Sequence, residues 1–237
     1  MAIAADFNVD KQALASLDQF LADAQRNIKN GNTCTIAKAF FATQPLVIKR
    51  YNIKSFWHGL NRALRASRAA KSWANAHRLI IANIATAKPL ALLEERFGCL
   101  RRRAYYLSAY VDAPDVKQFF ASAIAEGDKQ IAARNVAALF YKLYLLRYTH
   151  GDCKANNIKI VNLAPVLIDL DAMLTHFGGM FSTWYFEKKH IKDLQRFMKN
   201  WENDIATTAL LKRALQLQYT SRHFYVGNNI LIRAGIA

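Results

Sequence analysis

The N-terminal quarter of the chain changes its hydrophobic period once. Residues 10–28 carry apolar side chains at helical spacing, which predicts an amphipathic helix. A turn is expected at "KNGN", residues 29–32. Residues 33–41 and 46–51 are then rich in β-branched and aromatic side chains, so they predict two strands joined by a short turn.

Further along, helical and strand patterns alternate. Residues 52–83 are Ala-rich and predict one long helix or two shorter ones. Two more strands are expected, one ending near Glu94 and the other running from Ala104 to Val111. The pattern is helical from 115 to 150 and again from 188 to 219.

These elements predict an α+β protein with two parts. Residues 1–112 form a small part that mixes strands and helices, and residues 113–237 form a mostly helical part. With 237 residues, of which 53% are hydrophobic, the chain can bury a substantial core, and disorder is not expected.

The charge balance predicts an anionic partner. The chain has 33 Lys and Arg against 17 Asp and Glu, a formal net charge of +16. Arg62, Arg65, Arg68 and Lys71 recur every three residues along one predicted helix. Nucleic acid, an acidic membrane surface and a phosphorylated molecule or glycolipid all remain open as partners. Basic residues interleaved with aromatic ones keep a nucleic-acid-binding protein as an alternative.

Cysteine usage and the apolar stretches indicate a location. Cys34, Cys99 and Cys153 are odd in number and far apart, which favours a reducing cytosol over a disulfide framework. The first residues do not resemble a secretory signal, and the longest apolar stretch is interrupted by Lys88 and Pro89. We expect a cytoplasmic protein, with peripheral contact to a membrane still possible.

The most informative segment is "THGDCKANNIKIVNLAPVLIDLDAM", residues 149–173. Asp152 follows a predicted helix in a turn that Gly151 permits, and Asn157 comes five residues later. The residues between Asn157 and Asp169 predict two short strands with a turn near Asn162–Pro165. Such a hairpin returns Asp169 close to Asp152 and Asn157.

This combination suits phosphoryl transfer. Asn157 and Asp169 offer oxygen ligands for Mg²⁺, and Asp152 can accept the proton of an attacking hydroxyl. Lys154 can neutralise charge on the transferred group. The order Asp-x-x-x-x-Asn followed by a strand-borne Asp is the protein-kinase arrangement, and Lys49 in "LVIKRY" resembles the strand lysine that holds ATP phosphates. Taken singly, each of these residues has an ordinary structural explanation.

Four segments together resemble the lipopolysaccharide core kinase family. They are "VIKRYNIKSFWHGLNRALRASRAAKSWANAHRL", "LRRRAYYLSAYV", "THGDCKANNI" and "VLIDLDAM", and the resemblance covers roughly residues 30–200. Members of this family phosphorylate heptose or Kdo in the lipid A–core glycolipid and have a two-lobed protein-kinase-like fold. The resemblance implies ATP and Mg²⁺ as cofactors, an anionic glycolipid as acceptor, and contact with the cytosolic face of the inner membrane.

The resemblance also implies a role for each matching position. Asp152 is the catalytic base beside Lys154, Asn157 and Asp169 are the metal ligands, and Lys49 binds the ATP phosphates. "LSAYVD", with Ser108 and Tyr110, is the hinge that meets adenine. Asp193 in "IKDLQRF" braces the catalytic loop, the alternative being a solvated carboxylate on a helix.

Two departures from the family pattern keep other functions open. Residues 50–93 contain no acidic residue, and Ser72 stands where relatives carry the Glu that pairs with the strand lysine. Ala109 replaces an acidic residue in the hinge. A small-molecule kinase of the aminoglycoside or choline type and a non-catalytic kinase-like scaffold therefore remain alternatives.

Overall fold

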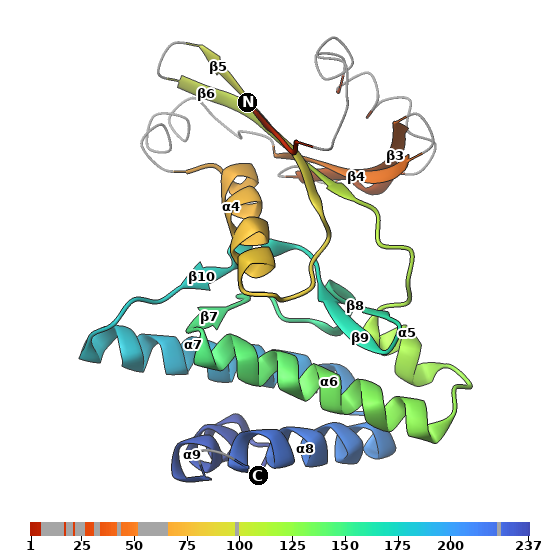
Figure 1. Cartoon of the computed structure of the whole chain (residues 1–237), viewed down its shortest axis with the longest axis vertical. Helices are drawn as coiled ribbons and strands as arrows, with labels where there is room; N and C mark the ends of the chain where they lie inside the picture. The colour runs from red at the N-terminus through yellow and green to blue at the C-terminus, as the bar shows by residue number, and fades with distance from the viewer. Residues whose placement is uncertain are drawn as a thin grey trace. The chain divides into compact units, whose positions relative to one another are not determined.

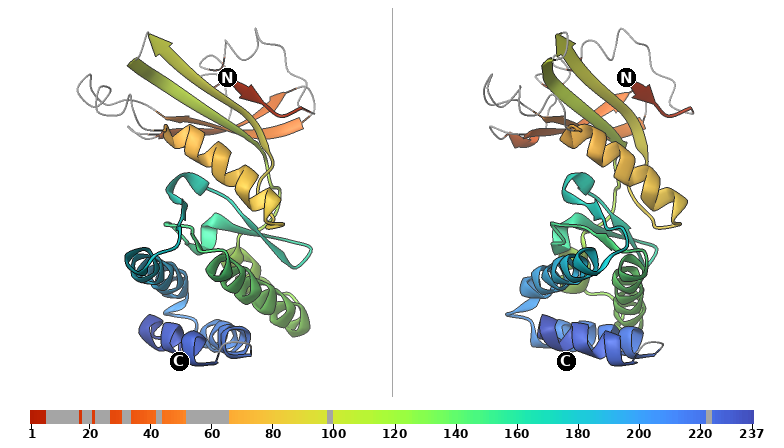
Figure 2. Two further views of the ribbon diagram at one scale, coloured as in Figure 1. Left: turned by 60° about the vertical axis from the view of Figure 1, so that its left-hand side comes forward. Right: turned by 90° about the vertical axis from the view of Figure 1, so that its left-hand side faces the viewer.

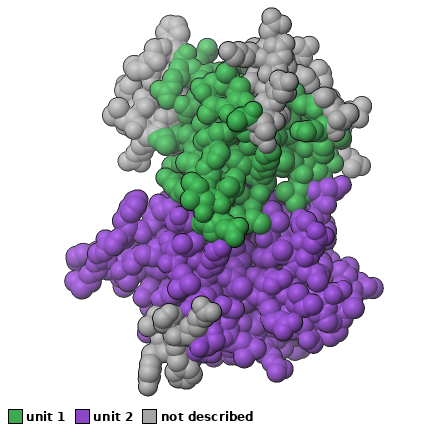
Figure 3. All heavy atoms as spheres, in the orientation of Figure 1, with its two compact units in different colours: residues 1–111 green, residues 112–237 purple. Residues whose placement is uncertain are grey.

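The computed structural model describes residues 1–5, 17, 21, 27–30, 34–41, 44–51, 66–97, 100–221 and 224–237. The chain divides into two compact units, residues 1–111 and residues 112–237, which Figure 3 shows in different colours. In the part of the chain that the structure describes, no helix combines the length and the apolar composition needed to cross a bilayer.

The described strands of the first unit form one antiparallel sheet in the order β1-β5-β6-β4-β3-β2. Their bounds are Ala2–Ile3 (β1), Asn27–Asn30 (β2), Cys34–Phe41 (β3), Gln44–Tyr51 (β4), Pro89–Phe97 (β5) and Leu100–Ala109 (β6). The hairpin of β3 and β4 confirms the strands predicted from β-branched and aromatic residues. Since β4 pairs with β3 on one side and β6 on the other, it is held at the centre of the sheet.

The ends of β5 and β6 differ from the prediction. β5 continues beyond Glu94, whereas β6 already begins before Ala104 and stops before Val111. The added length is charged, and Arg96 donates a hydrogen bond to the Glu94 carboxylate at 2.8 Å. Tyr105 likewise donates to Glu95 at 3.0 Å. The second of these hydrogen bonds joins β6 to β5, in a part of the hairpin whose charged sequence lacks the alternating apolar pattern of a half-buried strand.

The start of the sheet corrects the predicted N-terminal helix and its turn. Leu17 and Leu21 are helical as expected, but residues 27–30 form β2, which pairs with β3. Neither the helix end at residue 28 nor the turn start at Lys29 is therefore right, because pairing with a neighbouring strand overrides local preference. The other residues of that predicted helix, apart from 27 and 28, lie outside the described residues.

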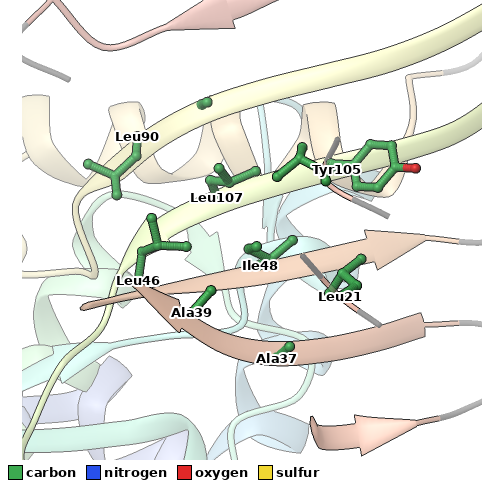
Figure 4. Packing of buried hydrophobic residues seen from close by; sticks show 10 residues of the cluster. Leu21, Ala37, Ala39, Leu46, Ile48, Leu90, Tyr105 and Leu107 are labelled. Carbon is green, nitrogen blue, oxygen red and sulfur yellow. The ribbon is translucent and has the colours of Figure 1, made fainter. Parts of the chain in front are cut away.

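One face of the sheet packs against the N-terminal helical residues. Leu17 and Leu21 are 2% and 3% exposed, and their spacing of four places them on one side of a helix. Figure 4 shows the cluster around Leu21; its other buried members are Leu17, Ala37, Ala39, Leu46, Ile48, Leu90, Ala91, Tyr105 and Leu107. Burial of each leucine contributes roughly 1.5–3 kcal/mol to folding.

The opposite face packs against α4, Arg68–Ile81, as Figure 2 shows. The helix begins after Ser67, whose hydroxyl accepts a hydrogen bond from the Ala70 N–H at 2.9 Å. Ala69 is fully buried in a cluster with Tyr51 and residues of β3 and β6, because its small side chain permits close approach of the helix. α4 confirms part of the helix predicted over residues 52–83; residues 52–65 lie outside the described residues.

The second unit is mainly helical. Its helices are α5 (Val116–Ala121), α6 (Glu126–Leu145), α7 (Met180–Met198), α8 (Ile205–Thr220) and α9 (Phe224–Ala234), and its short strands are β7 (Tyr148–Thr149), β8 (Ile158–Val161), β9 (Ala164–Leu167) and β10 (Leu174–Thr175). In Figure 1, α8 and α9 form a layer against α6 and α7, in agreement with the contacts of α6 with α8 and of α7 with α9.

Aromatic side chains fill the core between these helices. The Phe140 ring of α6 lies 5.0 Å from the Phe197 ring of α7, and the Phe197 ring lies 5.9 Å from that of Trp201. Such ring pairs add stability beyond their buried area. The region predicted as helical from 115 to 150 is correct except at two interruptions. Residues 122–125 separate α5 from α6, and after α6 the strand β7 pairs with β10 just before the His-Gly-Asp turn.

Candidate active site

Asp193 of α7 fixes the His-Gly-Asp turn. The residue is 3% exposed, and its carboxylate accepts hydrogen bonds from the backbone N–H of His150 at 2.7 Å and of Gly151 at 3.0 Å. Burial raises the pKa of Asp193, while the two N–H donors act in the opposite direction. The bracing role expected for Asp193 is confirmed, and the alternative of a solvated helix carboxylate is wrong.

The turn is also attached to the strand that follows it. The His150 ring nitrogen Nε2 lies 3.0 Å from the carbonyl oxygen of Ile168, at the end of β9. Because a carbonyl oxygen only accepts hydrogen bonds, Nε2 must carry the hydrogen. Gly151 has φ +79°, and a Cβ atom there would lie 2.5 Å from the Ala172 carbonyl oxygen. Only glycine fits this position without strain.

The Asp152 carboxylate lies between two cations. Its Oδ1 is 3.2 Å from Lys154 Nζ and 3.4 Å from Arg196 Nη1, and Arg196 also donates to the Gly151 carbonyl. All three side chains are partly exposed, so each pair adds at most about 1 kcal/mol to stability. The pairs therefore orient the carboxylate while leaving it accessible to a substrate.

Arg196 is the residue that sequence reasoning missed. It follows Asp193 by three residues on α7, so both side chains lie on the same side of the helix. Asp193 accepts hydrogen bonds from backbone N–H groups of the turn, and Arg196 donates to the Gly151 carbonyl and to the Asp152 carboxylate. The spacing of Asp and Arg in "IKDLQRF" was the available signal, once Asp193 had been assigned to the loop.

The β8–β9 hairpin places Asn157 and Asp169 at the same end. Ile158 is paired with Leu167, and the Ile168 N–H donates to the Asn157 carbonyl at 3.0 Å. Residues 162 and 163 both have positive φ and form the turn. The predicted hairpin is confirmed, and Asp169 follows directly on the last hydrogen bond of its ladder.

The Asn157 amide is oriented by Asp152. Its Nδ2 donates to the Asp152 carbonyl oxygen at 2.8 Å and lies 3.3 Å from Asp152 Oδ2. The amide oxygen is therefore the atom left to bind a cation. Among the described residues, no three His, Cys, Asp or Glu side chains gather as a metal site. One amide oxygen with the Asp169 carboxylate fits Mg²⁺, which takes its other ligands from phosphates and water.

Asp169 has a strained backbone. Its φ of 61° and ψ of 60° lie in the left-handed region, where aspartate is among the few non-glycine residues found. This conformation ends the extended strand β9 and begins the short helical turn Leu170–Ala172. Strain of this kind, of order 1–3 kcal/mol, often marks residues whose position serves a function.

Cys153 stands between the predicted catalytic residues but is not suited to react. It is 1% exposed, and burial, together with the nearby Asp193 and Asp152, raises the pKa of its thiol. A thiol with a raised pKa stays protonated and is a poor nucleophile. Of these two side chains, the turn leaves the Asp152 carboxylate partly exposed and the Cys153 thiol buried.

The residues predicted to bind the nucleotide lie in the first unit. Lys49 of β4 is opposite Tyr106 of β6, and Val47 is opposite Ser108. Residues two apart on a strand lie on the same side, so Lys49 and Ser108 share one face of the sheet. Tyr51, on that same face, lies with its hydroxyl 3.4 Å from Ser72 of α4.

Tyr110 follows the end of β6. Its N–H donates to the Pro45 carbonyl at 3.1 Å, which fixes the backbone just after the sheet. Lys38 Nζ lies 3.7 Å from the centre of the Tyr110 ring, a cation–π contact. Ser108 is 5% exposed, so of the two predicted hinge residues Tyr110 is the more accessible.

The surroundings of Ser72 in α4 suit a small side chain and not an acidic one. Ser72 is 1% exposed and points to Tyr51, where a longer charged side chain would have to displace neighbours. α4 contains no Asp or Glu, so no carboxylate of this helix is available to Lys49.

Comparison with known proteins gives a family and a fold. The family model described as "Lipopolysaccharide kinase (Kdo/WaaP) family" matches residues 18–212. A solved structure titled "WaaP in complex with acyl carrier protein" is similar with a TM-score of 0.65 and 17% sequence identity. The similarity covers 99% of this chain and 93% of that one. A search of curated proteins finds no match.

At this level of identity the solved structure establishes the fold alone. The α+β fold of the WaaP structure therefore confirms the fold class predicted from the sequence, with its antiparallel sheet and its helical C-terminal part.

Proposed function

The chain belongs to the lipopolysaccharide kinase (Kdo/WaaP) family, and we propose that it transfers the γ-phosphoryl group of ATP, with Mg²⁺, to a sugar hydroxyl of the lipopolysaccharide inner core. The acceptor sugar is heptose or Kdo. The observation that carries this proposal is the Asp152 carboxylate, which is accessible, oriented by two cations and hydrogen-bonded to the Asn157 amide.

Asp152 acts on the acceptor. Its carboxylate orients the sugar hydroxyl and accepts its proton as the hydroxyl oxygen forms a bond to the γ-phosphorus. The bond from that phosphorus to the bridging oxygen breaks, and ADP leaves. Lys154, 3.2 Å from Asp152, neutralises charge on the phosphoryl group in transit. Asp193 and Arg196 keep the turn in the conformation that presents Asp152.

Asn157 and Asp169 would hold the metal ion. Mg²⁺, when bound, neutralises charge on the β- and γ-phosphates and makes the phosphorus more electrophilic. The chain contributes the orientation of the ligands. Asp152 fixes the Asn157 amide, and the β8–β9 hairpin positions Asp169, whose own backbone is left-handed.

The nucleotide contacts come from the first unit. Lys49 binds ATP phosphates from the central strand of the sheet, and the backbone around Ser108 and Tyr110 meets adenine. These assignments follow the resemblance of the chain to the family and the location of Lys49 and Ser108 on one face of the sheet.

The charge of the chain suits a glycolipid acceptor. A net charge of +16 attracts the phosphates and carboxylates of a lipopolysaccharide core. Such a glycolipid is met at the cytosolic face of the inner membrane, so we place the chain in the cytoplasm with peripheral contact to that surface. Of the four basic residues that recur every three positions from Arg62 to Lys71, the structure describes Arg68 and Lys71, and both are exposed at the start of α4.

Nucleotide binding measured by calorimetry tests the metal site. The wild-type chain is expected to bind ATP in the presence of Mg²⁺ and much more weakly in its absence. Asp169→Ala should weaken the Mg²⁺-dependent binding by about tenfold or more, because a charged contact contributes roughly 1.5–3 kcal/mol.

Asp171→Ala is the matched control. It removes the same charge two residues away, from the short turn Leu170–Ala172, and should bind Mg²⁺ and ATP within about threefold of the wild type. Wild-type protein that binds no ATP, or equal losses in the two variants, would contradict the assignment of Asp169.

A further inference from the structure

The first turns of α7 and the residues just before them carry large apolar side chains that are exposed. Phe177, Met180, Phe181, Trp184 and Tyr185 are exposed by 80%, 81%, 84%, 57% and 42%. Scattered exposed apolar residues are ordinary, but five large ones within nine positions are an unusual local concentration. We call these five residues the aromatic tip. In Figure 1 this end of α7 reaches past the end of α6.

The patch follows one stripe of the helix. Phe181, Trp184 and Tyr185 are spaced by three and four residues, so they lie on one side. The buried stripe of the same helix comprises Phe186, His190, Ile191, Asp193, Leu194 and Phe197. Packing in the second unit therefore uses another side of α7, and the core does not require the aromatic tip.

Lysines continue the exposed stripe. Lys188 lies seven residues after Phe181, and its Nζ is 4.9 Å from the centre of the Trp184 ring. Lys189 Nζ is 5.3 Å from that of Tyr185. The acidic residues of α7 do not offset them, because Asp193 is buried and Glu187 pairs with Arg233 at 3.1 Å. Positive charge thus borders the apolar surface.

The conformation of the tip is held by its own hydrogen bonds. The N–H of Thr183 donates to the Gly179 carbonyl at 2.9 Å, and Arg147 donates to the Thr183 hydroxyl at 3.0 Å. Ser182 donates to the Phe177 carbonyl. The apolar side chains are therefore presented by a formed helix end, without folding on contact.

From this geometry we infer that the aromatic tip inserts into the interface of an anionic phospholipid bilayer, with Lys188 and Lys189 against the headgroups. Trp, Tyr and Phe favour the level of the headgroups, and flanking lysines favour anionic lipid. Charge complementarity selects a membrane over a neutral protein groove as the occupant. The inference rests on the proposed function in one respect: an acceptor that is anchored in lipid gives the chain a reason to contact a membrane.

Co-sedimentation with vesicles tests it, in the absence of nucleotide. The wild-type chain should bind vesicles of phosphatidylcholine containing phosphatidylglycerol, and bind pure phosphatidylcholine more weakly. The double variant Phe181→Ser, Trp184→Ser should lose about tenfold or more in binding to the mixed vesicles. Exchanging Lys188 and Lys189 for Gln should cost about fivefold per lysine at low salt.

Ile205→Ser is the matched control. Ile205 is 85% exposed at the start of α8, so it offers a similar apolar side chain at a helix start outside the tip. Its exchange should leave vesicle binding unchanged. Equal binding by wild type and the double variant, or no binding by the wild type, would overturn the inference. The inference would also be overturned if the double variant changed only the self-association of the chain, measured by sedimentation velocity. The aromatic tip would then contact a second copy of the chain and not a membrane.

Vesicle binding and phosphoryl transfer can be tested independently of each other. The Asp152→Asn chain should bind vesicles as the wild type does, because Asp152 lies outside the aromatic tip. A wild-type chain that binds vesicles but transfers no phosphate would count against the proposed function alone. A wild-type chain that transfers phosphate but binds no vesicles would count against the inference alone.

Discussion

The backbone of the His-Gly-Asp turn depends on one glycine. Gly151 combines φ +79° with an approach to the Ala172 carbonyl that leaves no room for a Cβ atom. Gly151→Ala should therefore lower the free energy of unfolding by about 1–3 kcal/mol, the usual cost of such strain. Urea unfolding followed by circular dichroism measures this directly.

Gly127 provides the comparison. It lies in the first turn of α6, and nothing stands within 4 Å of the place where a Cβ atom would be added. Gly127→Ala should raise the stability by about 0.5 kcal/mol, because alanine has less freedom to lose on folding. A Gly151→Ala protein as stable as the wild type would show that the turn adapts more easily than its geometry indicates.

Individual residues of the site were predictable to different degrees. Asp152, Asn157 and Asp169 stand at spacings that a hairpin converts into proximity, so the sequence was enough to propose them. The left-handed backbone of Asp169 left no trace in the sequence, because aspartate is common in many conformations. Arg196 escaped attention since its partner, the Gly151 carbonyl, is 45 residues earlier in the chain.

At the scale of elements, the buried side of α7 contributes to two parts of the second unit. It supplies Asp193 to the His-Gly-Asp turn and His190 to the helical core. The His190 ring nitrogen lies 2.6 Å from the Tyr219 hydroxyl of α8, and the residue is 1% exposed. Burial lowers the pKa of His190 from 6.5 to about 3.

This shift makes the stability depend on pH. Between pH 6.5 and about 3, His190 takes up a proton in the unfolded chain but stays neutral in the folded one. Its contribution is therefore fully present above pH 6.5 and is lost as the pH falls, by up to about 1.4 kcal/mol per pH unit. His190→Gln should flatten this part of the profile. Thermal unfolding across that range measures the slope for both proteins, and identical slopes would rule out a buried neutral His190.

Elements with their own hydrophobic pattern were found from the sequence, and those defined mainly by pairing or packing with other elements were not. β3, β4 and the β8–β9 hairpin each carry their own alternation and turn residues. β2 and β7 are short strands whose conformation is set by pairing, β2 with β3 and β7 with β10, which lies 25 residues further on. α9 lies beyond the last predicted helix and packs against α7 and α8. Local propensity cannot report such pairings.

At the scale of the whole molecule, chemistry is divided between the two units. The predicted nucleotide contacts Lys49, Ser108 and Tyr110 belong to residues 1–111, whereas the predicted catalytic and metal residues belong to residues 112–237. The excess of positive charge was visible from composition, but its assignment to a glycolipid needed the family. The aromatic tip was not foreseen, because the helix predicted from the sequence begins only at residue 188, after all five residues of the tip.

Transfer of labelled γ-phosphate from ATP to lipopolysaccharide that lacks core phosphate tests the central claim most directly. With Mg²⁺, the wild-type chain should label the acceptor, and Asp152→Asn should reduce the rate by about 10²–10⁴-fold, since general-base catalysis contributes that much. Asp171→Asn, the same exchange outside the catalytic set, should keep most of the rate. An unlabelled acceptor with wild-type protein, or an Asp152→Asn rate equal to the wild type, would contradict the account.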